Sequence, residues 1–247
     1  MDTSKIKEIS KGVKEIKNAG KIVWGGYIDK TGTPGPKRLV GGNADAGFFG
    51  ECPTSDFITG DELARLIGLT AGTSQYSNEP WLKFSYMGKV EFIAKKPFRY
   101  RISWNSINSV NAVYGDRTVQ IKRKKYKIRL IKGKTEGKQD DISNWNGFIC
   151  HNSEWNRLML PIHKNAPRNW RYPENVESPT EDWEIKYSDN DLIVNNGNGF
   201  GSWCQECGDS SSNRLLRGGF ISSSSLMSPY SDDHYIYGWR PVLELVR

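Results

Sequence analysis

Two short stretches near the carboxyl end of the chain, Arg214-Leu-Leu-Arg-Gly-Gly219 and Gly238-Trp-Arg-Pro-Val242, decide the fold that the sequence predicts. The first begins a strand at Leu215. The second forms the Trp239-Arg240-Pro241 bend of a terminal strand predicted over residues 235–246. A polar loop with four serines at 222–225 lies between the two stretches. The end of the chain is therefore expected to consist of short strands joined by long loops.

The chain upstream of these stretches predicts further short strands and a few short helices. Thr59 and Glu62 form a capping box, and Gly68 ends the helix that it begins. The apolar face of this helix is expected to be Leu63, Leu66 and Ile67. Strands are predicted at 81–86, 90–94, 99–104, 182–187 and 192–195, a hairpin at 118–131, and a short helix at 154–162. The pattern favours an α+β domain over residues 45–247, with short, twisted antiparallel strands.

Residues 1–44 are expected to form a separate N-terminal helix and arm. Ile6, Ile9, Val13 and Ile16 recur at the 3-4-3 spacing of a coiled-coil seam, and Thr31-Gly-Thr-Pro-Gly-Pro36 indicates an irregular connecting arm. A helix of this length is marginal alone in water, so it must pack on its own domain, on a copy of itself or on a neighbour. We expect the four apolar residues to anchor the chain against another chain, in a homo-oligomer.

The composition favours a loop-rich protein with an aromatic core. Hydrophobic residues make up 36% and aromatic residues 12%, with nine tryptophans and a net charge of +7. Much of the positive charge lies between Arg117 and Lys138, around the predicted tip Lys122–Lys125. A solvated turn explains this run best, nucleic acid is an unlikely partner, and an acidic protein or cell-surface polymer is the remaining alternative. No export signal or membrane span is visible, so synthesis in the cytoplasm is expected.

Motifs that would indicate an enzyme are missing. The chain has no phosphate-binding loop and no Gly-x-Ser-x-Gly elbow, and its three histidines are isolated. Cys204 and Cys207 have a zinc-type spacing, and Asp189 and Asp191 offer calcium-type oxygens. Neither pair makes a complete site, so no catalytic residue, no cofactor and no metal are expected, although calcium and zinc at these two pairs stay open.

Aromatic and polar residues near the carboxyl end form a candidate binding surface. Tyr, Trp, Ser and Asn are common in adaptable contact surfaces. The candidate ligand-binding residues are Trp203, Tyr230, Asp232, Asp233, Tyr235 and Tyr237. The alternative is that the aromatic side chains alternate into a sheet core while the serines only solvate a loop.

The Arg-Gly-Gly stretch, the polar loop and the Gly-Trp-Arg-Pro-Val stretch resemble the closing motif of the C-type-lectin-like superfamily. The most similar branch contains formylglycine-generating enzymes and surface proteins of phages and bacteria. The motif covers about the last 35 residues of the chain. This resemblance implies a C-type-lectin-like domain.

One departure from the formylglycine-generating enzymes bears on activity. Those enzymes carry catalytic cysteines just after Arg-Gly-Gly, whereas residues 220–238 of this chain contain none, and Cys204 and Cys207 precede the motif. The resemblance therefore implies the fold without the activity.

A second resemblance covers more of the chain. Gly47-Phe-Phe-Gly-Glu51, Phe57-Ile-Thr-Gly-Asp61, Gly68–Ser74, Pro80–Phe84 and Ser153–Arg157 look like segments of tailed-bacteriophage virion proteins, in which such a region precedes a lectin-like ending. It implies a non-enzymatic virion protein of the tail, collar or capsid surface. Such a protein would contact other virion proteins and a host cell-surface glycan or protein. The alternatives are a virion enzyme that degrades polysaccharide or peptidoglycan, and a bacterial surface adhesin, which the missing export signal disfavours.

Overall fold

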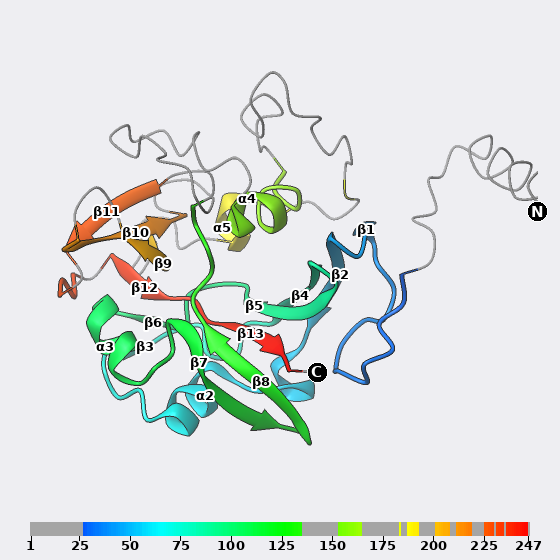
Figure 1. The fold of residues 1–247 in the computed structure, drawn as a ribbon, viewed down its shortest axis with the longest axis horizontal. Helices are drawn as coiled ribbons and strands as arrows, with labels where there is room; N and C mark the ends of the chain where they lie inside the picture. The colour runs from blue at the N-terminus through cyan, green and yellow to red at the C-terminus, as the bar shows by residue number, and fades with distance from the viewer. Residues whose placement is uncertain are drawn as a thin grey trace, which may run out of the picture.

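The computed structural model describes residues 27–134, 153–164, 183, 187–192, 201–207, 211–218, 225–229, 231–234 and 236–246. These ranges form two sheets and a few short helices (Figure 1). Antiparallel pairing dominates, so the α+β class expected from the sequence is confirmed. Within the same ranges, no helix has the length and the apolar character needed to cross a membrane. The predicted helix at residues 1–18, with its anchoring residues, lies outside the described residues.

The larger sheet has seven strands in the order β1-β2-β4-β5-β13-β8-β7, and every neighbouring pair is antiparallel. The strands are β1 (Gly41–Gly42), β2 (Ala46–Cys52), β4 (Trp81–Tyr86), β5 (Lys89–Ala94), β7 (Tyr114–Ile121), β8 (Lys124–Arg129) and β13 (Val242–Leu245). The last strand of the chain, β13, lies between β5 and β8. Three segments that are distant in sequence therefore meet in the middle of this sheet.

The smaller sheet has six strands in the order β11-β10-β9-β12-β6-β3. They are β3 (Thr73–Ser74), β6 (Arg99–Tyr100), β9 (Gly201–Cys207), β10 (Asn213–Arg217), β11 (Ser225–Pro229) and β12 (Tyr237–Trp239). Only the β9–β12 pair among them is parallel. The helices are the 3-10 turn η1 (Thr54–Asp56), α2 (Gly60–Ile67), α3 (Trp104–Ser109), α4 (Glu154–Leu158) and α5 (Asp189–Leu192).

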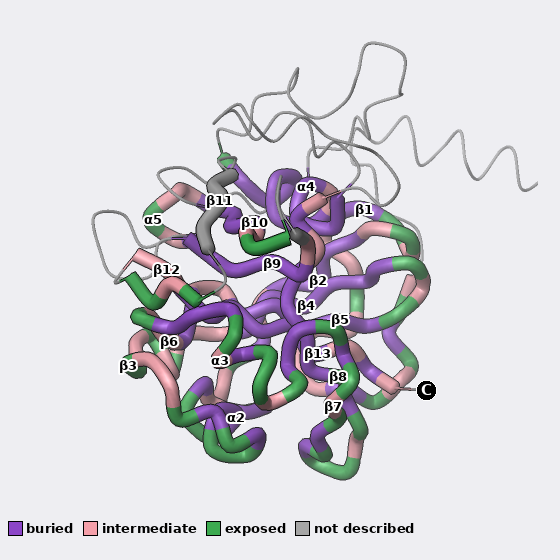
Figure 2. Tube along the Cα trace, turned by 60° about the vertical axis from the view of Figure 1, so that its left-hand side comes forward, coloured by how far each residue is buried: buried purple, intermediate pink, exposed green. Residues whose placement is uncertain are grey.

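Both faces of the larger sheet carry hydrophobic core. Side chains alternate along each strand, so β5 points Val90 and Phe92 to one face, here called the first face, and Glu91 and Ile93 to the other, the second face. The first face packs against α2 and α3, and the second against α4, α5 and Trp183. Figure 2 shows β4 buried along its length, whereas the β7–β8 hairpin alternates between buried and exposed residues. The second face is therefore covered only over part of its width.

Helix α2 begins and ends as the sequence predicts. The Thr59 hydroxyl accepts a hydrogen bond from the Glu62 amide at 3.2 Å, and the Glu62 carboxylate accepts from the Thr59 amide at 3.0 Å. Gly68 ends the helix in the left-handed conformation, with φ of 72°. The predicted apolar face is partly wrong, because Leu66 is 46% exposed and Ala64 takes its place in the core.

Replacing Thr59 with alanine is expected to lower the free energy of unfolding by about 1 kcal/mol, because the Glu62 amide in the first turn loses the hydroxyl that accepts its hydrogen bond. Urea unfolding of the purified chain measures this loss. Thr70→Ala removes an exposed threonine just after the helix and should change stability by less than about 0.5 kcal/mol. Equal effects of the two substitutions would contradict the capping role.

The basic hairpin predicted over 118–131 is confirmed as β7 and β8. Lys122 and Arg123 form its two-residue turn, both at positive φ (45° and 65°), as a type I′ turn requires. The Lys122 ammonium donates to the carbonyl of Asp56 at 2.6 Å, and that of Lys124 donates to the carbonyl of Thr31 at 2.6 Å. Two lysines of the run therefore hold neighbouring loops in place.

Three predicted strands have a different form. The strand expected over 99–104 ends at Tyr100, because the Ser103 hydroxyl accepts from the Ser106 amide at 3.1 Å and starts α3. Leu192, expected to begin a strand, ends helix α5. The terminal strand expected over 235–246 is two strands in different sheets, β12 and β13, separated at Arg240-Pro241. A helix cap at Ser103 and a break at Arg240-Pro241 therefore end two of the strands that the sequence predicted.

The segment from residue 27 to 44 is packed against the domain, which corrects the expectation of a connecting arm there. The Lys83 ammonium is fully buried and bonds the Asp29 carboxylate at 2.7 Å. It also donates to the carbonyls of Pro34 and Pro36, at 2.9 and 2.8 Å. A buried ammonium needs such partners, so the Gly/Pro stretch wraps around it instead of acting as a flexible spacer.

Candidate functional site

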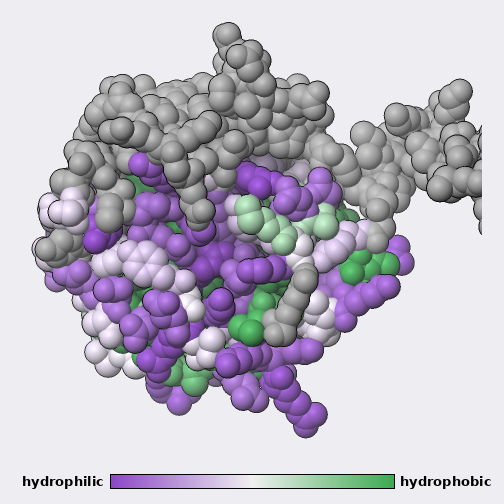
Figure 3. Space-filling view, viewed as in Figure 1, coloured by the Kyte–Doolittle hydropathy of each residue, from purple (hydrophilic) through white to green (hydrophobic). Residues whose placement is uncertain are grey.

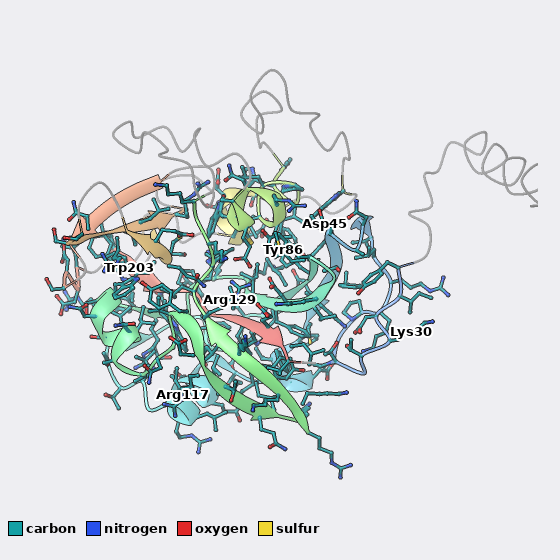
Figure 4. All side chains as sticks on the ribbon, in the orientation of Figure 1. Lys30, Asp45, Tyr86, Arg117, Arg129 and Trp203 are labelled. Atoms are coloured by element: carbon teal, nitrogen blue, oxygen red, sulfur yellow. The ribbon has the colours of Figure 1, made fainter. Side chains whose placement is uncertain are left out.

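The second face of the larger sheet is polar where the covering helices end, and this part contains a pocket of about 280 Å³. Its lining residues come from β4, β5, β7, β8, β13 and α4, from β9 of the smaller sheet and from adjoining loops: Tyr86, Met87, Lys89, Glu91, Tyr114, Lys127, Arg129, Lys132, Glu154, Gln205 and Glu244. Figure 4 shows Arg129 and Tyr86 close to the middle of the molecule. The surrounding surface is mostly hydrophilic (Figure 3). We refer to this site as the arginine pocket.

Arg129 organises the floor of the arginine pocket by binding three glutamates. It forms a two-pronged contact with Glu154, with N–O distances of 2.8 and 2.7 Å. It also contacts Glu91 at 2.7 Å and Glu244 at 3.3 Å. Glu91 and Glu244 are direct cross-strand partners on β5 and β13, and Glu154 begins α4. One guanidinium therefore ties α4 to three neighbouring strands.

The pKa values of the two most deeply buried glutamates of the pocket are shifted in opposite directions from the ordinary value. Burial raises the pKa of Glu91 well above its usual range, against the pull of Arg129. Burial would also raise the pKa of Glu154, but Arg129 and several hydrogen bonds bring that pKa below its ordinary value. The two carboxyl groups face each other, and the opposite shifts of their pKa values favour the proton on Glu91 over Glu154. The floor is therefore a buried network of ionisable groups centred on Arg129.

The rim of the arginine pocket is basic and partly apolar. Lys89 bonds Glu244 at 2.6 Å, yet its side chain remains 47% exposed. Lys127 is exposed and forms no ion pair within the described ranges. Met87 and Tyr114, 62% and 50% exposed, are the largest apolar groups there. The pocket thus has carboxylate oxygens at its floor. At its mouth it has the lysine ammonium groups and the ring of Tyr114.

The two arginines of the closing motif are structural in this chain. Arg217 and Arg240 are fully buried, and their guanidinium carbons lie 5.8 and 5.4 Å from the ring centre of Trp155 on α4. Arg217 bonds the Asn156 amide oxygen at 2.6 Å. Arg240 donates to the Ser202 hydroxyl at 3.0 Å and also to the carbonyls of Ala94, Lys95 and Leu192. The motif therefore holds α4, α5 and both sheets together.

The binding residues expected near the carboxyl end lie apart from the arginine pocket. Trp203 is fully buried and donates its indole N–H to the Ile102 carbonyl at 2.7 Å, so it serves the core and not the surface. Its ring packs on Tyr237, with ring centres 5.0 Å apart. Asp232 is half-buried and Asp233 exposed on the loop before β12, while Tyr230 and Tyr235 lie outside the described residues. Figure 4 shows Trp203 on the smaller sheet, to the left of Arg129.

The candidate metal ligands have other partners. The Asp191 carboxylate accepts hydrogen bonds from the Ser188 amide and hydroxyl, and these lower its pKa. Asp189 contacts His163 at 3.1 Å, and Cys204 is buried. The side chain of Cys207 lies outside the described part. Among the described residues, no three His, Cys, Asp or Glu side chains group as a metal would need.

Comparison with protein families, curated proteins and solved structures finds no match to this chain. The arginine pocket must therefore be interpreted from its own chemistry.

Sequence analysis missed this pocket, although two weak signals were present. Glu91 interrupts the apolar strand Lys-Val-Glu-Phe-Ile-Ala, and Glu244 interrupts Val-Leu-Glu-Leu. An acid inside such a strand indicates a buried partner, since charged side chains are rarely buried alone. The partner, Arg129, comes from a different strand, so only the sheet order connects them.

Proposed function

We propose that this chain is a non-enzymatic structural component of a tailed-bacteriophage particle that presents a lectin-like domain to the host surface. The observation that carries this proposal is the arginine pocket, an open polar site with a basic and aromatic rim whose acids are held by Arg129. The sequence resemblance to virion proteins of the tail, collar or capsid surface supports the same role. The protein would be made in the host cytoplasm and incorporated into the virion, as a homo-oligomer among other virion proteins.

The lectin-like assignment of the domain is part of this proposal. Its support is the closing motif, whose arginines are buried against Trp155 and join both sheets. Because its arginines join the sheets, the motif stabilises the fold. Loops and exposed sheet faces are then available for binding. The assignment predicts that exposed loop residues outside the motif can vary without loss of the fold.

A polysaccharide-cleaving enzyme is the second candidate, because Glu91 and Glu154 are paired acids of unequal pKa. Glycosidases use one protonated and one ionised carboxyl group in this way. Here, however, the two side chains are only 2% and 0% exposed, and both contact Arg129. A substrate would have to break this network to reach them. Binding is therefore the better explanation of the site.

Purified chain added to host cells before infection is expected to slow adsorption of the particles, because it occupies the same surface polymer. The measurement is the first-order rate of loss of free particles at increasing protein concentration. Lys127→Gln, a change at the pocket rim, should compete less well than the unmodified chain. An adsorption rate that stays constant at saturating protein would count against host contact.

A further inference from the structure

We propose that the arginine pocket binds an acidic polysaccharide, with one sugar ring in the pocket and its anionic groups on the lysines around it. This inference rests on the proposed host-binding function and names the ligand class of that site. The second face of the sheet beyond the pocket is open. Its exposed side chains continue the basic rim, because Lys125 and Lys127 point to the same side of β8 as Arg129.

Charge is the first argument for an anionic ligand. Arg129, Lys89, Lys127 and Lys132 bring four basic groups to the pocket, whereas Glu91, Glu154 and Glu244 bring three acidic ones, all of which already contact Arg129. Lys127 has no ion-pair partner in the described ranges, so its charge is available. The neighbouring Lys125 adds to the same field. Such a face attracts anions, most strongly at low salt.

Hydrogen-bonding chemistry is the second argument, and it separates a sugar from a nucleic acid. The floor carries the carboxylates of Glu154 and Glu244, and that of Glu244, which is only partly buried, can accept hydrogen bonds from hydroxyl groups of a ligand. A phosphate backbone brought against these carboxylates would be repelled. A ligand with both hydroxyl groups and separate anionic groups can donate hydrogen bonds to the carboxylates of the floor and pair its anions with the lysines of the rim. Acidic sugars have this combination.

Size and shape provide the third argument. A volume of about 280 Å³ is close to the lower end of small-ligand pockets, roughly 300–1,000 Å³, and suits a single ring better than an extended peptide. The half-exposed ring of Tyr114 lies at the mouth, where a sugar face can pack on it. The Gln205 amide donates to the Leu130 carbonyl at 2.8 Å, which fixes this polar side chain in the lining of the pocket. The remaining sugars of a chain would follow the lysines along β8.

The test is binding of the purified full chain to three probes: oligoalginate, neutral dextran and a single-stranded oligonucleotide. Saturable binding to oligoalginate that weakens with salt, with no binding to dextran, is the expected result. Lys127→Gln and Tyr114→Ala should each lower the affinity roughly three- to tenfold. Lys30→Gln removes an exposed charge far from the pocket (Figure 4) and should leave the affinity unchanged.

Three results would overturn the inference: no binding of oligoalginate, equal binding of the oligonucleotide, or equal losses in Lys127→Gln and Lys30→Gln. Thermal melting of each variant separates a lost contact from a lost fold. Failure of this inference can be distinguished from failure of the virion proposal. A chain that binds oligoalginate but is absent from particles would refute the virion role alone, and a particle protein that ignores oligoalginate would refute the ligand alone.

Discussion

Replacing Arg129 with methionine is expected to lower the free energy of unfolding by about 3–5 kcal/mol, because removal of one partner leaves buried carboxylates without compensation. Glu154 loses both of its guanidinium bonds, and Glu91 loses its contact at 2.7 Å. This is a large share of the about 5–15 kcal/mol typical of a whole domain. Denaturant unfolding at neutral pH measures the loss.

The matched control is Lys127→Met, two residues earlier on the same face of β8, where the side chain is exposed. Its effect should stay within about 0.5 kcal/mol. Adding Glu154→Gln to Arg129→Met should recover part of the loss, since the stranded charge is removed. A loss below about 1 kcal/mol in Arg129→Met would mean that the network does not hold α4 to the sheet.

Replacing Asp29 with alanine is expected to cost about 3 kcal/mol or more, since it leaves the Lys83 ammonium buried without its counter-ion. The Asp29 and Lys83 side chains are both fully buried, 2.7 Å apart. Loss of this pair should also release the segment around Pro34 and Pro36, because their carbonyls bind the same ammonium. Faster proteolysis near these residues, with little change elsewhere, is the local readout.

The same pair predicts a pH dependence. Burial would raise the pKa of Asp29, but hydrogen bonds from Lys83, Thr31 and Thr33 hold it far below its ordinary value. The folded chain therefore binds this proton less tightly than the unfolded chain. The stability that Asp29 contributes is complete above about pH 4 and is lost as the pH falls further.

Asp29→Ala should accordingly show a flatter decline of stability below about pH 4 than the unmodified chain. Asp116→Ala, at an exposed position on β7, should follow the unmodified chain in that range. Identical acid profiles for Asp29→Ala and the unmodified chain would show that the buried pair contributes nothing to acid sensitivity.

Features set by neighbouring residues could be predicted from the sequence. Thr59 and Glu62 are three residues apart, and their reciprocal bonds are local, so α2 was predicted with its cap. The β7–β8 hairpin follows from alternation around a two-residue turn. The strand expected over 99–104 failed because Ser103 can cap a helix as well as continue a strand, and its surroundings decide which.

Features that depend on distant segments could not be predicted. Glu91 and Glu244 are far apart in sequence, and they become direct neighbours only because β13 inserts between β5 and β8. The role of Arg240 was hidden for the same reason, since its partners include Ser202 and Ala94. Trp203 was expected at a binding surface because aromatic composition does not distinguish surface from core.

The central claim is that the chain is a stoichiometric component of the virion, and peptide mapping of purified particles tests it most directly. The account predicts peptides from across the chain at a constant ratio to the major capsid protein in independent preparations, and retained after high-salt washing. Peptides found in the infected-cell lysate but missing from purified particles would contradict it.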